Sequence, residues 1–349
     1  MKKIFIFTLV ILTVLFSCKK QKNEELKASR ISDFFAELKN YPDIYGFIYW
    51  NENWENENGK MTAMTINTSE ASLEAFQKGI AEDLYLSKSQ FTNGKLQAIP
   101  NKKYYGSFPE FVSEEDIVTK DKIIEYDELG EKPMAWVYFS NNWTNDITFP
   151  AQYVEIIKNL GKTPFIRLAP RTIFEQYKPD PKYTMQDIID GVYDEELQQW
   201  ASDAKNCETN LLIEFGTEIN GAWFSWNGLY HGGGTTDNYG DNSYPDGPER
   251  FRDAYRHIID IFNEEGADNI TWFFHIDDLI EPNEWWNHPE YYYPGDQYID
   301  WIGISAYSLM IPDDDYIEPE YLLEQADSLM RAVSTTKPFA ILEFGVSEI

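Results

Sequence analysis

LLIEFGTEINGAWFSWNG, residues 211–228, decides the fold, because a short apolar run is followed at once by a glycine, a carboxylate and aromatic side chains. A second run of this kind, FAILEF at residues 339–344, also carries a glutamate near its end. Short, uninterrupted apolar runs are typical of parallel strands that are buried on both faces. The two stretches therefore predict two strands of one buried parallel sheet.

Eight segments have this strand-like character: residues 45–50, 104–108, 134–139, 164–168, 210–215, 270–275, 299–306 and 339–344. Amphipathic stretches with apolar residues three and four positions apart lie between them and predict helices. Such alternation is typical of parallel strands joined by helical crossovers. The sequence therefore predicts an α/β fold, a (β/α)8 TIM barrel that residues 28–349 form as one domain.

The N-terminus reads as an export signal, since two lysines precede an apolar stretch that is too short to span a bilayer as a helix. The stretch ends in LFSC, which is similar to a bacterial lipoprotein processing site. We expect residues 1–17 to be removed, Cys18 to carry lipid, and residues 18–27 to form a solvated tether. The protein would then be an exported lipoprotein of the cell envelope or cell surface, held to the membrane by Cys18. An ordinary signal peptidase site and an uncleaved anchor are the alternatives.

The composition restricts the possible partners. The formal net charge is −30, and such a surface repels phosphate backbones, so nucleic acid is not expected as a partner. Acidity does not repel a neutral polysaccharide or oligosaccharide, whereas it disfavours polyanionic glycans. Aromatic residues make up 16% of the chain, and those in turn-rich stretches offer flat faces on which sugar rings stack. Part of this aromatic surplus is still ordinary packing.

Two glutamates, Glu218 and Glu343, each close a predicted strand and are expected at the C-terminal mouth of the barrel, where barrel enzymes keep their chemistry. One carboxyl group can protonate a leaving oxygen while the other attacks an anomeric carbon, as in most glycosidases. Trp223 and Trp226, which follow Glu218, are expected to stack on sugar rings. Either glutamate could instead be a solvated residue at the rim.

Other chemistries lack their motifs. The HGGGTT segment lacks the Lys-Ser/Thr ending of a phosphate loop, and no Gly-x-Ser-x-Gly elbow occurs. No His/Cys cluster suggests zinc, and the acidic loop at residues 237–246 lacks the Gly and the terminal Glu of an EF-hand. We therefore expect no cofactor and no metal.

Several separated segments resemble glycoside hydrolase family 26 and its clan of retaining (β/α)8 hydrolases: TEINGAWFSWNG, FRDAYRHIIDIFNEEGADNITWFF, YYPGDQYIDWIGISAY and AILEFG. The likeness covers most of residues 104–349. It implies that Glu218 is the acid/base and Glu343 the nucleophile. It also implies that Tyr307 orients Glu343 and that Trp50 forms the floor beneath the sugar next to the cleaved bond.

The chain departs from the family in two ways. Mannanases of the family have His directly before the acid/base and Arg a few residues earlier, where this chain has Thr217 and Glu214. The chain also ends soon after Glu343, while residues 28–90 look like the family's last helix–strand–helix unit. We expect a circularly permuted barrel with that unit at the N-terminus. A fragment of a tandem or truncated gene is the alternative.

The predicted function is that of a retaining β-glycoside hydrolase acting on a neutral β-glycan, foremost β-mannan. Mixed-linkage glucan and β-1,3-xylan are alternative substrates, and a catalytically inactive, glycan-binding surface lipoprotein is the alternative function. Asn142, Trp143 and Arg167 are expected to line the mouth, although Arg167 could equally pair with a carboxylate. His275, at the end of a strand, could bind a sugar hydroxyl.

Overall fold

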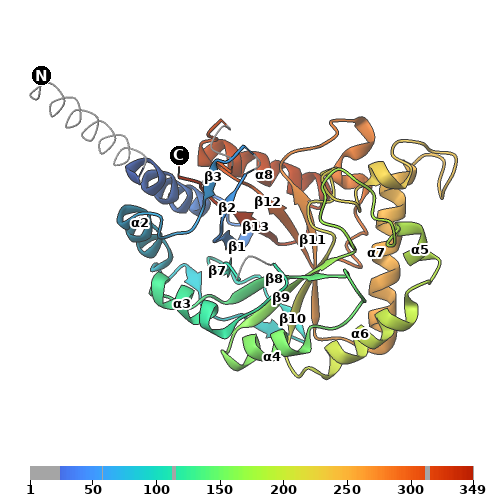
Figure 1. Cartoon of the computed structure of the whole chain (residues 1–349), viewed down its shortest axis with the longest axis horizontal. Helices are drawn as coiled ribbons and strands as arrows, with labels where there is room; N and C mark the ends of the chain where they lie inside the picture. The colour runs from blue at the N-terminus through green and yellow to red at the C-terminus, as the bar shows by residue number, and fades with distance from the viewer. Residues whose placement is uncertain (1–23, 57, 112–114, 311–314, 349) are drawn as a thin grey trace, which may run out of the picture.

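The structure, a computed structural model, describes residues 24–56, 58–111, 115–310 and 315–348 (Figure 1). The expected signal peptide and Cys18 lie outside these residues. Residues 24–27, the end of the expected tether, are helical, and the Lys27 ammonium is buried, where it donates hydrogen bonds of 2.9 Å to the carbonyl oxygens of Ala63 and Thr65. The folded part therefore begins before the expected boundary at residue 28. Within the described ranges, no helix has the length and apolarity needed to cross a membrane.

Eight parallel strands form a closed ring. They are β1 (Ile44–Trp50), β7 (Lys103–Phe108), β8 (Trp136–Asn142), β9 (Thr163–Ala169), β10 (Leu211–Phe215), β11 (Ile270–Asp277), β12 (Trp301–Ser305) and β13 (Phe339–Phe344). Each strand pairs with the next along the chain, and β1 pairs with both β13 and β7. All eight predicted strands are present, and the predicted (β/α)8 barrel is confirmed.

The ring closes through the N-terminal segment. Gly46 of β1 is in register with Ala340 of β13 on one side and with Tyr104 of β7 on the other. The helix that precedes β1 packs Phe34 against Phe344, with ring centroids 3.6 Å apart. The leading residues thus belong to the barrel, while their origin by circular permutation stays a prediction.

Helices surround the ring on its outer side (Figure 1). They are α2 (Glu70–Ile80), α3 (Lys120–Gly130), α4 (Ala151–Asn159), α5 (Met185–Ile189), α6 (Asp194–Asn206), α7 (Asp246–Glu265) and α8 (Pro319–Val333). Two hairpins, β2 (Asn53–Glu55) with β3 (Met61–Ala63) and β5 (Phe91–Thr92) with β6 (Lys95–Leu96), and the short strand β4 (Tyr85–Leu86) complete the sheets. The helices bury apolar stripes against the strands, as amphipathic helices in such folds do.

The interior of the barrel has an apolar layer and a polar layer. Large rings fill the first, where Phe273 lies 6.2 Å from Trp136 and 5.5 Å from Trp301 between ring centroids. Side chains two positions further along a strand point to the same face. Tyr138 and His275 therefore continue the inward rows of Trp136 and Phe273 toward the C-terminal ends of the strands. This polar layer supports the candidate site.

Candidate active site

Glu343 lies on β13 with both carboxylate oxygens held. The Tyr307 hydroxyl donates a 2.7 Å hydrogen bond to Oε2, which is the contact that the resemblance implies. The guanidinium of Arg167 forms an ion pair with Oε1. Burial raises the pKa of Glu343 to about 7, while the charge of Arg167 and the hydrogen bond from Tyr307 act to lower it. Glu343 is thus a fixed carboxyl group that changes its charge near neutral pH.

Glu218 follows β10 in a turn of unusual backbone geometry. Its φ angle is +50°, in the left-handed region that residues other than glycine seldom adopt, and the preceding Gly216 has a φ of +65°. Such outliers concentrate at functional sites. The indole of Trp223 donates a 2.7 Å hydrogen bond to Glu218 Oε2. The negative charge of Glu218 contributes to the raised pKa of Glu343, so the two carboxyl groups act on one another.

Two more buried carboxyl groups end β11. Burial raises the pKa of Asp277, and it raises that of Asp278 to about 7; in both cases the charge of Glu218 adds to the effect. Asn220 fixes this strand end, because its side chain accepts a 2.8 Å hydrogen bond from the Asp277 N–H and donates one of 2.9 Å to the Asp277 carbonyl oxygen. Carboxyl groups are therefore concentrated around Glu218, and the raised pKa values of Asp277 and Asp278 favour their neutral, protonated forms.

Glu214 lies beneath the predicted catalytic pair, fully buried on β10. The Tyr138 hydroxyl donates to its Oε1 at 2.5 Å, and His275 Nδ1 lies 2.9 Å from its Oε2. Although burial raises the pKa of Glu214, the charge and hydrogen bond of His275 and the charge of Arg167 bring it below its usual range. Glu214 is therefore a carboxylate inside the barrel.

His275 does not bind sugar in this arrangement, which corrects the sequence-based expectation. Its side chain is 1% exposed, because β11 continues to Asp277 and leaves His275 below the mouth. Both ring nitrogens are already occupied: Nδ1 lies 2.8 Å from the Thr217 hydroxyl as well as near Glu214, and Nε2 lies 2.9 Å from Ser305 Oγ. The imidazole is therefore part of the supporting network.

The structure also corrects the predictions that Trp143 lines the mouth and that Trp226 stacks on a sugar ring. The two side chains are 0% and 1% exposed, so neither offers a free face to a sugar. Trp143 packs edge-on against Tyr183, and Trp226 stacks on Phe224 with centroids 4.4 Å apart. The Trp226 indole donates a 2.7 Å hydrogen bond to the Thr217 carbonyl oxygen. Both tryptophans stabilise the loops around the mouth from within.

Arg167 lies deeper than a lining role requires, and Trp50, which the resemblance implies as the floor beneath the sugar, is also buried. Arg167 is buried, and besides Glu343 it contacts Tyr138 Oη at 3.1 Å and Glu115 Oε2 at 3.1 Å. Its role as a partner of carboxylates, the alternative reading of the sequence, therefore describes its place better than lining the mouth. Trp50 ends β1, where it stacks on Phe108 with centroids 4.3 Å apart and lies 5.5 Å from the Arg167 guanidinium.

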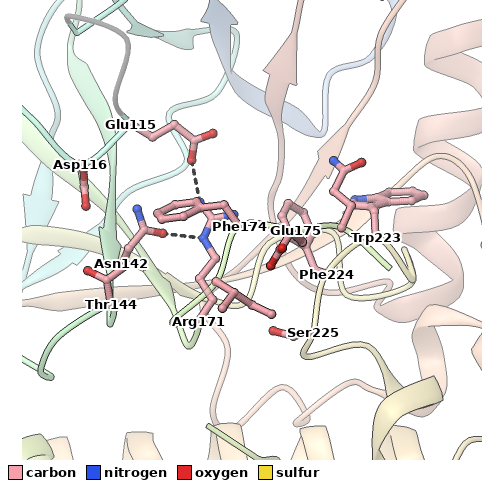
Figure 2. A pocket seen from close by; sticks show the side chains of 12 residues that line it. Glu115, Asp116, Asn142, Thr144, Arg171, Phe174, Glu175, Trp223, Phe224 and Ser225 are labelled. Atoms are coloured by element: carbon pink, nitrogen blue, oxygen red, sulfur yellow. Dashed lines mark hydrogen bonds and ion pairs between the residues drawn. The ribbon is translucent and has the colours of Figure 1, made fainter. Parts of the chain in front are cut away.

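A cavity of about 580 Å³ opens beside Trp223 (Figure 2). It is lined by Glu115, Asp116, Asn142, Thr144, Arg171, Ile173, Phe174, Glu175, Gln176, Trp223, Phe224 and Ser225. Asn142 and Trp223, both predicted from the sequence, are among them. Because the Trp223 indole bonds Glu218, the cavity wall connects directly to the predicted acid/base.

The cavity is also lined by Arg171, which the sequence analysis did not single out. Its Nε donates to Asn142 Oδ1 at 2.7 Å, its Nη2 lies 3.2 Å from Glu115 Oε2, and Phe174 lies over the guanidinium at 4.5 Å (Figure 2). Phe174 is 59% exposed and so presents a free aromatic face. The position of Arg171 just beyond a predicted strand was the available signal. Across the described part of the chain, no group of three or more His, Cys, Asp or Glu side chains is placed to hold a metal ion.

Comparison with known proteins identifies relatives of this chain. Residues 182–332 match the family model Glycosyl hydrolase family 26. Endoglucanase H of Acetivibrio thermocellus is 25% identical over 236 residues, which are 66% of this chain and 23% of that protein. Mannan endo-1,4-beta-mannosidase A and B of Caldalkalibacillus mannanilyticus is 29% identical over 165 residues, 47% of this chain and 26% of that protein. The chain thus spans about a quarter of the length of these curated relatives.

Solved structures of the same family are similar at low identity. A ruminal GH26 endo-beta-1,4-mannanase matches 80% of this chain and 58% of its own, with a TM-score of 0.47 and 12% identity. A GH26 beta-mannanase from Bacteroides ovatus matches 93% of this chain and 77% of its own, with a TM-score of 0.44 and 12% identity.

Proposed function

Since these comparisons assign the chain to glycoside hydrolase family 26, we propose that it is a retaining β-glycoside hydrolase that acts on a neutral β-glycan, foremost β-mannan. One observation carries the proposal: Glu218 and Glu343, at the ends of β10 and β13, interact at the mouth of one closed barrel beside the cavity that Trp223 lines. The names of the two curated relatives support a glycan as the substrate.

The proposed reaction is a double displacement. Glu343 attacks the anomeric carbon as a carboxylate, the glycosidic C–O bond breaks, and Glu218 donates its proton to the leaving oxygen. Glu218 then takes a proton from water, which attacks the anomeric carbon and releases Glu343. This scheme calls for carboxyl groups about 5–5.5 Å apart. Tyr307 and Arg167 support it, because they hold the attacking group in one orientation.

The surroundings of the pair favour a neutral sugar. Phe174 and Trp223 offer aromatic surface in the cavity. The cavity is lined by three carboxylates against a single arginine that is already paired, so it would repel a uronic acid. Mixed-linkage glucan and β-1,3-xylan are neutral as well and could use the same site, whereas β-mannan is favoured by the name of one relative.

Product analysis on a panel of β-glycans tests the proposal. We expect the wild-type protein to release sugars whose newly formed reducing ends are first β-configured by NMR. Glu218→Ala and Glu343→Ala should each lower kcat by at least about 10³-fold, since each removes one member of a pair that acts together. Glu290→Ala, which removes an exposed glutamate, is the matched control. Release of the α-anomer would refute the retaining mechanism.

A catalytically inactive glycan-binding protein is the second candidate. The placement of Thr217 and Glu214 where the family's mannanases carry His and Arg favours it, because the surroundings of the acid differ. The same panel separates the two functions. Wild-type protein that binds a glycan without turning it over, with binding unchanged in Glu218→Ala and Glu343→Ala, would establish the binder.

We further propose that the protein is an exported lipoprotein anchored to the cell envelope through Cys18. The LFSC sequence after an apolar leader supports this placement. A surface location would bring the barrel to a polysaccharide too large to enter the cell.

A further inference from the structure

His275 connects the two strand ends that carry the predicted catalytic carboxyl groups. On one side its Nδ1 lies 2.8 Å from the hydroxyl of Thr217, the residue directly before Glu218. On the other side its Nε2 lies 2.9 Å from Ser305 Oγ, and Ser305 is in register with Glu343 on the neighbouring strand. One imidazole thus contacts an immediate neighbour of each carboxyl group.

Glu214 fixes this imidazole from below. Its Oε2 lies 2.9 Å from His275 Nδ1, and its Oε1 accepts the 2.5 Å hydrogen bond of Tyr138. Both His275 and Glu214 are fully buried, so neither exchanges its partner for bulk water. A buried carboxylate without a partner is costly, which makes a cationic imidazole the natural complement of Glu214.

We propose that His275, held as an imidazolium by Glu214, is a positioning residue that fixes Thr217 and Ser305 and thereby sets the placement of Glu218 relative to Glu343. The inference rests on the proposed glycosidase function. It also accounts for the altered motif: where the family's mannanases have His before the acid/base, Thr217 reaches an imidazole supplied by β11 instead. A guanidinium is likewise supplied by another strand. Glu214 stands where the family's mannanases have Arg, and Arg167 of β9 lies 3.6 Å from Glu214.

The charges around the imidazole agree with this role. Burial lowers the pKa of His275, but the charge and hydrogen bond of Glu214, and then the charges of Glu343 and Glu218, raise it above its usual range overall. The ionisable groups that act on the imidazole are Glu214 of β10, Glu218 just after that strand and Glu343 of β13, and Glu214 in turn contacts Tyr138 of β8 and Arg167 of β9. The positive charge in turn acts to lower the pKa of Glu343.

The proposal predicts a particular kinetic change. His275→Asn keeps an N–H donor near the place of Nδ1 but removes the positive charge, whereas His275→Ala removes both. We expect kcat to fall about 10-fold in His275→Asn and about 100-fold in His275→Ala, with KM within about 3-fold of wild type, because the carboxyl groups are misplaced while the binding surface stays. The acid limb of the pH profile should move to higher pH in both, since loss of the cation raises the pKa of Glu343.

The matched control is His257→Asn. His257 lies on α7 outside the barrel, where its Nε2 lies 2.7 Å from Asp194 Oδ1, so it forms a similar pair away from the site. We expect unchanged kcat and an unchanged pH profile in this variant. Thermal unfolding of each variant shows whether the barrel is intact. Should the His275 variants fail to fold, the isosteric Glu214→Gln replaces them, with the same shift of the acid limb expected.

NMR of the imidazole nitrogens of His275 tests the charged pair without any turnover. The wild-type ring should lose its proton at a higher pH than an unperturbed imidazole, and it should lose it at a lower pH in Glu214→Gln than in the wild type. If the wild-type protein cleaves no glycan, the proposed function fails while this titration still decides whether the imidazolium pair exists. A wild-type ring that loses its proton at no higher pH than an unperturbed imidazole overturns the inference. An active enzyme whose kcat and acid limb are unaltered by His275→Asn overturns it as well.

Discussion

Tyr307 donates a 2.7 Å hydrogen bond to Glu343 Oε2, from the segment that follows β12 to the strand beside it. Arg167 holds the other oxygen of the same carboxylate from across the barrel. Two partners from different strands thus fix the plane and the direction of one side chain. A carboxylate held in this way can approach an anomeric carbon without first losing rotational freedom.

Removing the Tyr307 hydroxyl tests this support. We expect Tyr307→Phe to lower kcat by roughly 10- to 100-fold, because a hydrogen bond to a charged group contributes about 1.5–3 kcal/mol. Steady-state kinetics on the glycan that the wild type cleaves best would measure the loss. Tyr321→Phe, which removes a hydroxyl from an exposed ring on α8, is the control and should leave kcat unchanged. A Tyr307→Phe enzyme with wild-type kcat would remove Tyr307 from the site.

The pH dependence follows from Glu343. Its pKa is raised to about 7 by burial, and it must be ionised to attack, so kcat/KM should fall as the pH drops through about 7. Arg167→Gln removes a charge that lowers this pKa, so the fall should occur at a higher pH. Arg331→Gln, which disrupts exposed ion pairs with Asp43 and Asp327, should leave the profile where it is. An acid limb that moved downward in Arg167→Gln would contradict this account.

A substitution of Trp223 tests the role of Glu218 as the acid. The Trp223 indole donates a 2.7 Å hydrogen bond to Glu218 Oε2, and the same ring lines the cavity. Trp223→Phe keeps an aromatic face but loses the hydrogen-bond donor. Proton transfer from Glu218 to the leaving oxygen should therefore be impaired more than substrate binding. We expect the loss of kcat/KM to be at least about 10-fold larger for a glycan than for a dinitrophenyl glycoside, whose leaving group needs no proton.

The control for this comparison is Trp285→Phe, which changes an exposed tryptophan on the 3-10 helix η3 (Trp285–Asn287). It should affect both substrates equally or not at all. Equal losses for the two substrates in Trp223→Phe would mean that the indole serves binding rather than the acid.

Much of the fold was predictable because its signals are local. An apolar run such as residues 339–344 identifies a strand by itself, and its single glutamate stands out within it. Strand order followed from chain order, since parallel strands joined by crossovers pair with their neighbours. The place of Glu218 and Glu343 at strand ends therefore followed from the sequence, and so did the entry of residues 44–50 into the ring.

The side chains around the pair were harder to predict, because their environment depends on strands far apart in sequence. Trp143 and Trp226 read as loop aromatics, yet loop packing covers their faces, and nothing local separates a covered ring from a free one. His275 and Arg167 read as residues at the mouth. Whether such a side chain meets a sugar or a buried carboxylate depends on how far its strand continues and on what the opposite strand presents.

The anchor proposal has its own test. Cys18→Ser should abolish incorporation of a labelled fatty acid into the full-length chain in a bacterial host, because the thioether to the lipid cannot form. The variant should leave the membrane fraction, while Cys207→Ser, which changes the half-buried cysteine near the end of α6, should stay with it. Equal labelling of wild type and Cys18→Ser would exclude Cys18 as the lipidated residue.

Closure of the ring by its first strand makes a prediction for stability. Phe47 of β1 is fully buried, and its ring lies 5.7 Å from those of Phe34 and Phe35 and 5.6 Å from that of Tyr105. Phe47→Ala should lower the free energy of unfolding by about 3–5 kcal/mol, because it leaves a cavity where the leading segment meets the barrel. Denaturant unfolding followed by tryptophan fluorescence and by circular dichroism would measure this loss.

The informative comparison is with Phe165→Ala, which creates a cavity inside the barrel between Tyr138 and Phe273. If the leading segment is part of one cooperative unit, both variants shift the same single transition, and both probes report the same midpoint. Met61→Ala, at an exposed position, should change the free energy of unfolding by less than about 0.5 kcal/mol. A separate transition at lower denaturant concentration in Phe47→Ala alone would show that residues 24–66 unfold apart from the rest of the barrel. In that case β1 would leave the ring readily and could not hold Trp50 beside Arg167.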